Sequence, residues 1–574
     1  MTSSDAPTRS SSRPLLDLVG ISENVTSVAD PAALIRELLA ASVLTLKNPA
    51  GIIAANARLA WGSAGALRAA AERAIGRDNP GPVAIARGDK RFSDLAYQEN
   101  PAYFLMAQQY LLFGQLVAEL VDAAGVSGTR EAKARFAARF LVDALAPTNT
   151  MAGNPAAIRK AFDTGGKSLG KGLKNMVHDL RHNGGWPSQV DSSAFEVGVN
   201  MGATPGSVVY RSELIELVQY TPQTPNAHAV PLLFCPPWIN KFYIMDLAPG
   251  KSLIEWAVQH GHTCFAISYR NADKSMSGLG FRDYLFQGPL DAVRVVRDIT
   301  GAPAVNTVSV CLGGTLTAIG LAYNADRGDD SIRSATFLNT HTDFTQPGLL
   351  GTFTDEGTVA GLEKQMQKKG YLDSSTMART FSALRPNDLI FQYMVNDWLL
   401  GNKPPSFDLL AWNEDSTRMP ARMHSEYLRS CYLRNEFARG EFEIDGNRVD
   451  PSHVDIDTYV LAAVDDHVVP WVSGYKTTQL LGGKSRFVLS SSGHIAGIVN
   501  PPNPKAKHWV NDSLPADPHD WKKHAQLVEA TWWQDWTAWI AERGGDMIPA
   551  PDHLGNDIYP AIEKAPGSYV LATA

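Results

Sequence analysis

The sequence lacks the residue patterns that mark disulfide-linked, nucleic-acid-binding or membrane-spanning proteins. Its 574 residues include only four cysteines and no Cys-x-x-Cys pair, so neither a disulfide framework nor a zinc site is expected. The net charge of -7 leaves no excess of basic residues with which to contact a nucleic acid. No uncharged apolar stretch reaches the roughly 20 residues that span a bilayer, so we expect no transmembrane segment.

The N-terminus also lacks the apolar stretch of a signal peptide. Residues 1–30 are rich in serine and other polar residues, and we expect them to form a disordered tail. We therefore expect a cytoplasmic protein, in which a cysteine thiol stays reduced.

Two patterns of hydrophobic residues divide the rest of the chain. Residues 31–205 carry apolar residues at helical spacing and little strand character, which predicts a helical N-terminal domain. Residues 206–574 contain short apolar runs bounded by glycine and proline, several of them separated by helical stretches. This alternation is typical of a mostly parallel sheet in an α/β fold. A chain of this length is too long for one core, so two domains are expected.

One connection in the α/β part is unusually long. It runs from a strand expected to end near Thr340 to a strand expected to begin near Ile456, and it includes helical patterns at Asn387–Leu400 and Ser425–Ala438. Insertions at this point of an α/β-hydrolase sheet commonly cover the active site. We therefore expect a cap at about residues 345–452.

Cys311 lies in a motif that predicts a strand, a sharp turn and a helix. The run Val305–Val310 has strand character, and a helical pattern begins near Leu312. The turn of a nucleophile elbow accepts only small residues two positions either side of the nucleophile, and Ser309 and Gly313 meet that requirement. A helix that begins beside the sulfur directs its amides and dipole at it, which favours a thiolate. The alternative is a buried cysteine that packs as a small hydrophobic residue.

Two further candidates follow Cys311 in the order nucleophile, acid, histidine that this fold uses. Asp466 follows a predicted strand at 454–464, and His494 follows one at 486–489. Open α/β sheets place their sites at the carboxyl ends of strands, so the three side chains can converge. A free thiol with a pKa of ~8.5 is mostly protonated at neutral pH, so an imidazole is needed to accept its proton. A carboxylate would then orient the imidazole or act as a base itself.

Neighbouring polar residues have simpler interpretations. Asp465 is interpreted as a solvated turn residue, because only one carboxylate is needed. His467 could be an ordinary hydrogen-bonded loop histidine. Trp532, Trp533, Trp536 and Trp539 have helical spacing and could contact a bound molecule, but we favour packing in the core.

An oxyanion hole is also expected. The predicted strand Leu232–Cys235 ends in the loop Pro236–Lys241, where this fold usually supplies one backbone N–H, and the residue after the nucleophile supplies the second. We assign the hole to the amides of Ile239 and Leu312. For Trp238 in the same loop, packing in the core is as well supported as a role in the site.

The chain resembles the polyhydroxyalkanoate synthases, which polymerise hydroxyacyl-CoA into storage polyester. The resemblance covers roughly residues 91–545, in ordered blocks: Tyr97–Pro101, Phe140–Leu145, Ser193–Gly198, Thr204–Gly206, Glu213–Leu217, Pro236–Lys241, Ser268–Asn271, Trp412–Thr417, Asp466–Trp471, Ser492–Gly497 and Trp532–Trp536. Ser309 departs from the family, which more often has glycine there, but it is small enough for the turn. The long N-terminal domain is similar to that of the single-chain, class I-like synthases.

The resemblance implies an α/β-hydrolase fold with a cap and an acyltransferase reaction. The enzyme would polymerise (R)-3-hydroxyacyl-CoA, with short-chain units such as 3-hydroxybutyryl-CoA favoured, through an acyl intermediate on Cys311 and with release of CoA. Asp466 and His494 match the aspartate and histidine of the family. No metal or tightly bound cofactor is expected. The implied partners are the CoA thioester, the growing polyester chain, the granule surface and a second copy of the chain in a homodimer.

Two alternatives remain from the residues themselves. A thioesterase or polyester depolymerase would use the same triad with water as the acceptor. A cysteine beneath an apolar cap favours transfer to an alcohol over hydrolysis. A non-catalytic granule-coat protein that retains the fold is the second alternative, and an intact set of Cys311, Asp466 and His494 argues against it.

Overall fold

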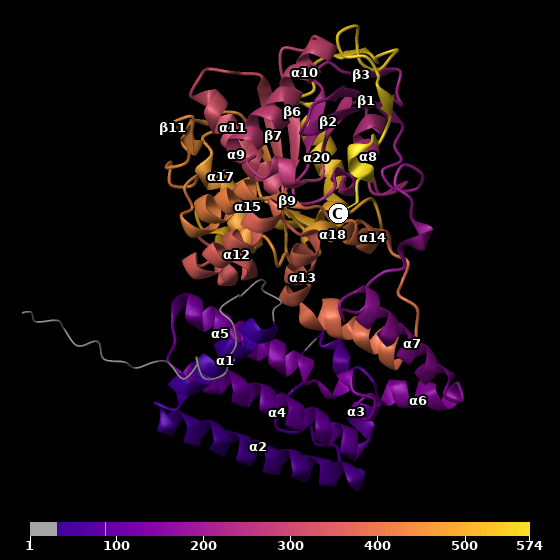
Figure 1. Cartoon of the computed structure of the whole chain (residues 1–574), viewed down its shortest axis with the longest axis vertical. Helices are drawn as coiled ribbons and strands as arrows, with labels where there is room; N and C mark the ends of the chain where they lie inside the picture. The colour runs from indigo at the N-terminus through magenta and orange to yellow at the C-terminus, as the bar shows by residue number, and fades with distance from the viewer. Residues whose placement is uncertain (1–30, 87, 574) are drawn as a thin grey trace, which may run out of the picture.

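A layer of helices lies below a sheet domain, and a set of cap helices lies between them (Figure 1). The computed structural model describes residues 31–86 and 88–573, and the tail expected at residues 1–30 lies outside them. The N-terminal helices are α1 (Pro31–Thr45), α2 (Pro49–Ala74), α3 (Ala96–Glu99), α4 (Pro101–Ala123), α5 (Gly128–Ala144), α6 (Pro155–Asp163) and α7 (Lys167–His182).

Asparagine followed by proline begins three of these helices. Asn48, Asn100 and Asn154 are the N-cap residues of α2, α4 and α6, and each accepts hydrogen bonds through its side chain from backbone amides of the first turn. The proline that follows each one has no N–H to leave unsatisfied and already has a helical φ. The same local signal therefore sets the start of three helices in the N-terminal domain.

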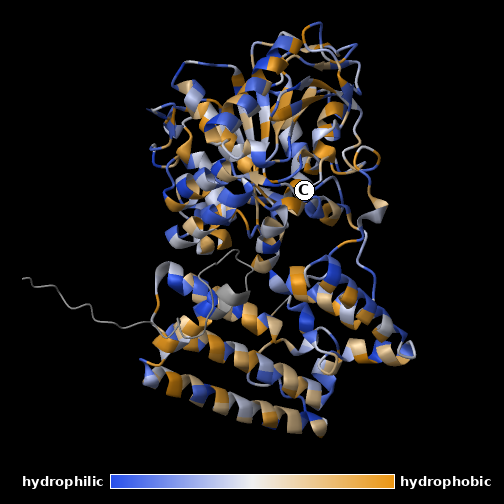
Figure 2. Cartoon of the chain, in the orientation of Figure 1, coloured by the Kyte–Doolittle hydropathy of each residue, from blue (hydrophilic) through white to orange (hydrophobic). Residues whose placement is uncertain are grey.

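Helix α4 packs against α2 and α5 in the N-terminal layer. By length and composition, α4 could cross a membrane, as could the bent pair α1 and α2 if taken as one span. Core helices of soluble proteins have the same composition, and α4 buries Phe104, Tyr110 and Leu112 within the layer. Figure 2 shows hydrophobic residues along much of α2 and α4.

In the described residues, eleven strands form one mixed sheet in the order β15-β14-β13-β12-β7-β6-β4-β5-β2-β1-β17. The six from β13 to β5 run parallel, and the outer strands pair antiparallel. The strands are β1 (Gly206–Arg211), β2 (Ile215–Tyr220), β4 (Leu232–Cys235), β5 (Cys264–Tyr269), β6 (Val305–Val310), β7 (Ile332–Leu338), β12 (Asp457–Ala463), β13 (Ser485–Ser490), β14 (His508–Val510), β15 (Gln526–Val528) and β17 (Glu563–Lys564). The parallel centre positions the site, since its carboxyl ends share one edge.

Helix α20 (Trp532–Ala541) carries the four tryptophans for which core packing was favoured, and that interpretation is confirmed. All four are buried, with Trp532 and Trp536 at 0% exposure. The indole Nε1 of Trp536 donates to Thr336 Oγ1 on β7 at 3.0 Å, so the helix lies directly on the sheet. The further helices of the sheet domain are α8 (Leu253–Gln259), α9 (Phe281–Leu285), α10 (Asp291–Thr300), α11 (Leu312–Ala325), α16 (Trp471–Tyr475), α17 (Thr477–Leu480), α18 (His494–Ile498) and α19 (Pro518–His524).

The segment expected to form a cap is mainly helical and lies over the carboxyl edge of the sheet (Figure 1). Its main elements are α12 (Glu356–Lys369), α13 (Ser374–Leu384), π-helical turns at Asn387–Phe391 and Met394–Leu399, α14 (Asp408–Glu414), and α15 (Ala421–Tyr427), which continues as a π-helical turn at Leu428–Leu433. Two short strands, β8 (Tyr371–Leu372) and β9 (Met419–Pro420), pair within it. The helix expected at Ser425–Ala438 begins and ends earlier, because Pro420 precedes its first turn and Asn435 has a left-handed φ of 48°.

Helix α5 of the N-terminal domain packs against the outside of the cap. The rings of Phe136 and Phe353 meet edge to face with centroids 4.7 Å apart. The ammonium of Lys133 lies 2.5 Å from the Asp355 carboxylate at the start of α12. Leu350 and Phe381 belong to the same apolar cluster as Phe136. The N-terminal domain therefore supports cap segments from behind.

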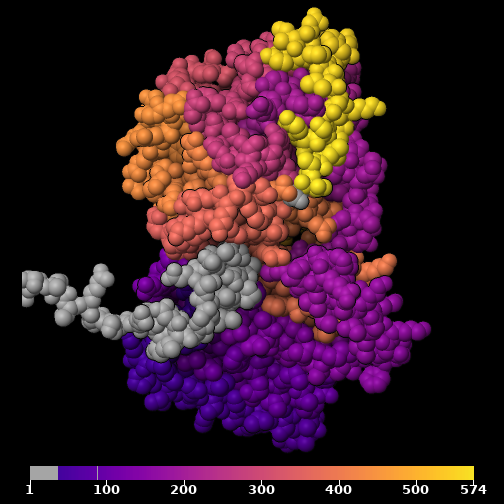
Figure 3. All heavy atoms as spheres, in the orientation of Figure 1, coloured from indigo at the N-terminus to yellow at the C-terminus, as the bar shows by residue number. Residues whose placement is uncertain are grey.

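Helix α7 and the cap segment 394–402 fit together without room for side chains at two points. A Cβ on Gly172 would lie 1.9 Å from the carbonyl oxygen of Trp398, and a Cβ on Gly401 would lie 2.3 Å from the carbonyl oxygen of Ser168. The indole Nε1 of Trp398 donates to Asp179 Oδ2 at 2.7 Å. We call this contact the glycine seam. Figure 3 shows the N-terminal domain and the cap in contact below the sheet domain.

Candidate active site

Cys311 occupies a sharp turn between β6 and α11. Its φ of 51° and ψ of -119° lie outside the regions that side chains prefer, a strain that recurs at nucleophile elbows. A Cβ on Gly313 would lie 2.3 Å from the carbonyl oxygen of Cys235, so this position requires glycine. Ser309 is fully buried, and its hydroxyl lies 2.9 Å from Thr317 Oγ1. A larger side chain at either position would displace the turn.

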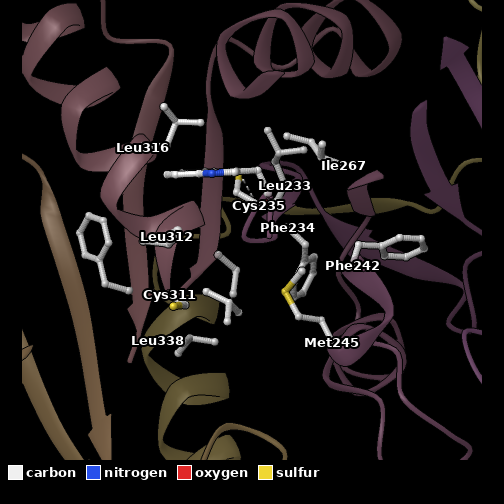
Figure 4. Packing of buried hydrophobic residues seen from close by; sticks show 14 of the residues in the cluster. Leu233, Phe234, Cys235, Phe242, Met245, Ile267, Cys311, Leu312, Leu316 and Leu338 are labelled. Atoms are coloured by element: carbon white, nitrogen blue, oxygen red, sulfur yellow. Dashed lines mark hydrogen bonds between the residues drawn. The ribbon is translucent and has the colours of Figure 1, made fainter. Parts of the chain in front are cut away.

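The sulfur of Cys311 faces a cavity at the carboxyl edge of the sheet. The residue is 9% exposed, and its backbone amide donates to the carbonyl of Leu338, at the end of β7, at 2.9 Å. Figure 4 shows the sulfur beside Leu312 and Leu338. Leu312 is the first residue of α11, so its N–H has no acceptor within the helix.

Asp466 and His494 meet beside this cysteine. His494 Nδ1 lies 2.6 Å from Asp466 Oδ2, the geometry of a charge-assisted hydrogen bond. The other carboxylate oxygen, Asp466 Oδ1, accepts from the amides of Val468 and Val469, each at 2.8 Å. The side-chain amide of Asn339 donates to the carbonyl of His494. The acid is therefore fixed by its own loop, and the imidazole is fixed by the acid.

The electrostatic setting of His494 favours its protonated form. Burial would lower the pKa of this imidazole, but the charge of Asp466 and the adjacent thiol of Cys311 outweigh burial and raise the pKa to about 10. The structure thus brings together the three side chains of the predicted triad.

The two neighbours of Asp466 behave differently from each other. Asp465 is exposed at the surface of the turn. His467 lines the cavity, and its Nδ1 is buried without a hydrogen-bond partner among the described residues. Burial is the largest of the causes that lower the pKa of His467 to about 4. Sequence reasoning left His467 as a loop histidine, whereas the structure gives it a place in the cavity wall.

The loop expected to form the oxyanion hole lies next to the elbow. Ile239 and Leu312 both line the cavity beside Cys311. Gly313, at the start of α11, lies against the carbonyl oxygen of Pro236, so the loop and the helix start are in direct contact. Trp238 is 2% exposed and packs edge-on against Phe281 and Tyr427, in the manner of a core residue.

Lys241, in the same loop, is bound to the cap at residues 412–415. Its ammonium lies 2.6 Å from Asp415 Oδ1, and Tyr243 donates its hydroxyl proton to Asp415 Oδ2 at 2.8 Å. The indole Nε1 of Trp412 donates to the Lys241 carbonyl at 2.9 Å. Two blocks that the sequence analysis treated separately, 236–241 and 412–417, are therefore neighbours, which only the tertiary fold could reveal.

The cavity has a volume of about 550 Å³ and is largely apolar. Cap side chains supply much of its wall, including Leu350, Phe353, Leu362, Leu372, Phe381 and Leu409. Such a chamber accepts a flexible acyl chain and disfavours water.

His341 is a further residue that the sequence analysis missed. It follows β7, and its Nδ1 and Nε2 lie 2.9 Å from Ser473 Oγ and 3.3 Å from the carbonyl of Val468. It therefore supports the loop that holds Asp466. The rule that located Asp466 and His494, a polar residue just beyond a parallel strand, also identifies His341.

Comparison with known proteins adds the family context. A family model described as "Poly-beta-hydroxybutyrate polymerase (PhaC) N-terminus" matches residues 88–257, and one described as "alpha/beta hydrolase fold" matches residues 230–501. The expected fold class, an α/β-hydrolase domain preceded by a mainly helical region, is thereby confirmed.

Several curated relatives are similar over most of their length. The poly(3-hydroxyalkanoate) polymerase subunit PhaC of Cupriavidus necator is 44% identical over 493 residues, which is 85% of this chain and 83% of the relative. Poly(3-hydroxyalkanoate) polymerase 1 of Ectopseudomonas oleovorans is 41% identical over 84% of this chain and 86% of the relative. The poly(3-hydroxyalkanoate) polymerase of Methylorubrum extorquens is 39% identical over 96% and 92%. Among solved structures, the monoacylglycerol lipase of Paleococcus ferrophilus has a TM-score of 0.33 at 12% identity and covers 58% of this chain and 98% of its own.

Proposed function

The chain belongs to the poly(3-hydroxyalkanoate) polymerase family of acyl-transferring enzymes, and from that premise we propose that it polymerises (R)-3-hydroxyacyl-CoA through an acyl intermediate on Cys311. The observation that carries this proposal is the hydrogen-bonded pair of His494 and Asp466 beside a cysteine at a strained elbow, with Cys311 and His494 lining an apolar cavity.

The first half-reaction acylates the enzyme. His494 holds the proton of Cys311, and the thiolate attacks the thioester carbonyl of the substrate. The amides of Ile239 and Leu312 donate to the tetrahedral oxyanion. As that intermediate collapses, the carbon–sulfur bond to CoA breaks and the imidazolium returns the proton to the departing CoA thiolate. A pKa of about 10 favours the protonated form of His494 at neutral pH, so the imidazolium is able to give its proton to the departing CoA thiolate.

The second half-reaction extends the chain. The 3-hydroxyl of one hydroxyacyl unit attacks an acyl thioester on Cys311, an ester bond forms, and the bond to sulfur breaks. The hydroxyl proton passes to the pair of His494 and Asp466, either directly to the carboxylate or through the imidazole. An alcohol is far less acidic than a thiol, so this step depends more on the base than acylation does.

The remaining parts of the proposal concern substrate, partners and location. We propose short-chain units such as 3-hydroxybutyryl-CoA, a growing polyester and its granule surface as partners, a homodimer, and a cytoplasmic location at the granules. The proposed reaction uses the thioester as its only activated group and needs no metal or bound cofactor.

Hydrolysis is the competing outcome on the same residues. A thioesterase or polyester depolymerase would admit water to the acyl-cysteine. The apolar wall that the cap adds to the cavity favours an alcohol held in place by its own acyl chain over free water. A cysteine nucleophile supports the same preference.

The proposal is tested by incubating the purified chain with 3-hydroxybutyryl-CoA. We expect stoichiometric CoA release, insoluble polyester, and a 3-hydroxybutyryl adduct on the peptide that contains Cys311. Release of CoA with free 3-hydroxybutyrate as the sole product would instead assign hydrolysis. No CoA release at all would reject the proposed substrate class.

A further inference from the structure

One face of a cap helix forms a wall of the cavity. In α15 and its π-helical continuation, His424, Tyr427, Leu428 and Tyr432 all line the cavity, and their spacing places them on one face. Burial raises the pKa of both phenols, and the nearby thiol of Cys311 adds to the shift in each case. The wall and Cys311 therefore line the same cavity, in which an acyl group on the sulfur would lie.

His424 is the unsatisfied member of this wall. It is 3% exposed, and its Nδ1 is buried with no hydrogen-bond partner among the residues that the structure describes. The ring lies 6.1 Å from that of Tyr427, measured between centroids. Met419 and Met423, its neighbours along the chain, are fully buried and apolar. The protein thus places a polar ring at an apolar cavity without completing its hydrogen bonds.

The imidazole is suited to an uncharged oxygen ligand. Burial lowers the pKa of His424 to about 4, so the ring is neutral at physiological pH. A neutral imidazole has one N–H donor and one acceptor nitrogen. It can therefore accept from an alcohol or donate to an ester oxygen, whereas a neutral ring offers no charge to a phosphate. A buried polar group without a partner costs roughly 1–3 kcal/mol, which a ligand oxygen would recover.

We propose that His424 hydrogen-bonds the oxygen at C3 of the bound acyl group, the hydroxyl of an incoming unit or the ester oxygen of the growing chain. This inference rests on the proposed function. An acyl thioester without an oxygen at C3 would leave the imidazole buried and unpaired, so the cavity selects 3-oxygenated acyl groups. A site built to pair a substrate hydroxyl rejects the analogue that lacks it.

His467 shares the unpaired Nδ1 and the cavity, but it is the residue next to Asp466 and belongs to the loop that holds the acid. Its substitution would disturb acylation of every substrate. His424 comes from α15 of the cap, so its substitution separates recognition of the acyl group from activation of the sulfur.

The experiment compares single-turnover acylation of Cys311 by 3-hydroxybutyryl-CoA and by butyryl-CoA, with CoA release and intact mass as readouts. We expect wild type to prefer the hydroxylated substrate. His424→Phe keeps an aromatic ring and should reduce that preference about tenfold or more, through slower reaction of 3-hydroxybutyryl-CoA. His424→Gln retains a donor and an acceptor and should keep most of the preference.

His262→Phe is the matched control. His262 is likewise buried, at 2% exposure, and both its ring nitrogens lack partners in the described chain, but it does not line the cavity. Its substitution should change stability and leave the substrate preference unaltered. If His424→Phe does not fold, the pair His424→Gln and His424→Met provides the same comparison.

Three results would overturn the inference. Wild type could fail to discriminate between the two thioesters, His424→Phe could keep the wild-type ratio within twofold, or His262→Phe could lose the preference equally. These results differ from failure of the proposed function, which would appear as absence of CoA release from 3-hydroxybutyryl-CoA by the wild-type chain.

Discussion

Two tryptophans illustrate how differently the two parts of the chain bury their side chains. Trp536 in the sheet domain is 0% exposed and packs on β7, whereas Trp61 on α2 is 84% exposed. The sheet domain has one continuous apolar cluster, while the N-terminal helices bury several small clusters rich in alanine. The sheet domain is therefore stabilised mainly by its own core, whereas the stability of the helical domain depends more on its contacts with the rest of the chain.

The difference also separates chemistry from support. In the sheet domain, the strained turn of Cys311 lies beside the hydrogen-bonded pair of His494 and Asp466. The helical domain contributes contacts to the cap, such as Phe136 with Phe353, and the glycine seam. Substitutions in the two parts should consequently fail in different ways, and the following predictions test this contrast.

Cys311→Ala should have the largest effect. It removes the nucleophile, so CoA release and polymer formation should fall by at least about 1000-fold, with the fold intact. CoA release in a thiol-independent assay, together with circular dichroism, measures both. Turnover near the wild-type rate would contradict the role of this cysteine.

Asp466→Asn should separate the two half-reactions. The paired His494 loses its charge partner, and elongation should fall at least about 100-fold because an alcohol needs the stronger base. A first turnover should still release CoA and leave an acyl or short oligomeric adduct on Cys311, detectable by intact mass. If no adduct forms at all, Asp466 serves mainly to orient His494.

Gly172→Ala should act on the glycine seam and leave the elbow unchanged. The added methyl meets the carbonyl oxygen of Trp398, and overpacking of this kind costs about 1–3 kcal/mol. Limited proteolysis of the cap and thermal unfolding would report the loss. Gly170→Ala on the same helix faces open space and should stabilise by about 0.5–1 kcal/mol through helix propensity. Equal effects of the two substitutions would argue against a tight seam.

The pH dependence of stability should reflect His494. The folded state holds its proton up to about pH 10, while an unfolded histidine with a pKa of 6.5 releases it, so this contribution is complete below pH 6.5 and declines as the pH rises toward 10. In Asp466→Asn the decline should become smaller, since only the contribution of Cys311 then opposes the lowering of the pKa by burial. Thermal unfolding of both proteins between pH 6 and 10 measures the difference, and parallel curves would contradict it.

Trp61→Gln should have the smallest effect on stability, within about 0.5 kcal/mol, because the ring is already in solvent. Trp536→Gln should lower the free energy of unfolding by at least about 3 kcal/mol, because the ring fills the core and its indole N–H donates to Thr336. Chemical denaturation of the two variants gives the comparison. A large loss in Trp61→Gln would show that α2 is covered in solution.

The sequence was most informative where local rules apply. The elbow around Cys311 could be predicted because strand, turn and helix signals are contiguous, and the order of Asp466 and His494 followed from the fold class. The helix boundaries at 421–433 could not be predicted as well. The π-helical turn does not follow the regular α-helical period, so the hydrophobic pattern does not show where it ends. Asn435 ends the helix with a left-handed backbone conformation, which asparagine tolerates but does not require.

Contacts between distant segments were beyond local reasoning. The pairing of Lys241 with Asp415 joins two loops 174 residues apart in number, and the unpaired nitrogen of His424 depends on what the cap leaves around it. Neither has a local signature. Their helical or loop context could be predicted, but their partners are determined by how the cap returns to the sheet.

The glycine seam constrains how this protein can be recombined with its relatives. The two backbones touch at Gly172 and Gly401, so the surfaces of α7 and of segment 394–402 are closely complementary in shape. A chimera that takes α7 from one parent and the segment 394–402 from another inherits two surfaces shaped for different partners. Exchanging both segments together preserves the joint, so the natural crossover point for domain shuffling lies after residue 402 and not at the end of the helical domain.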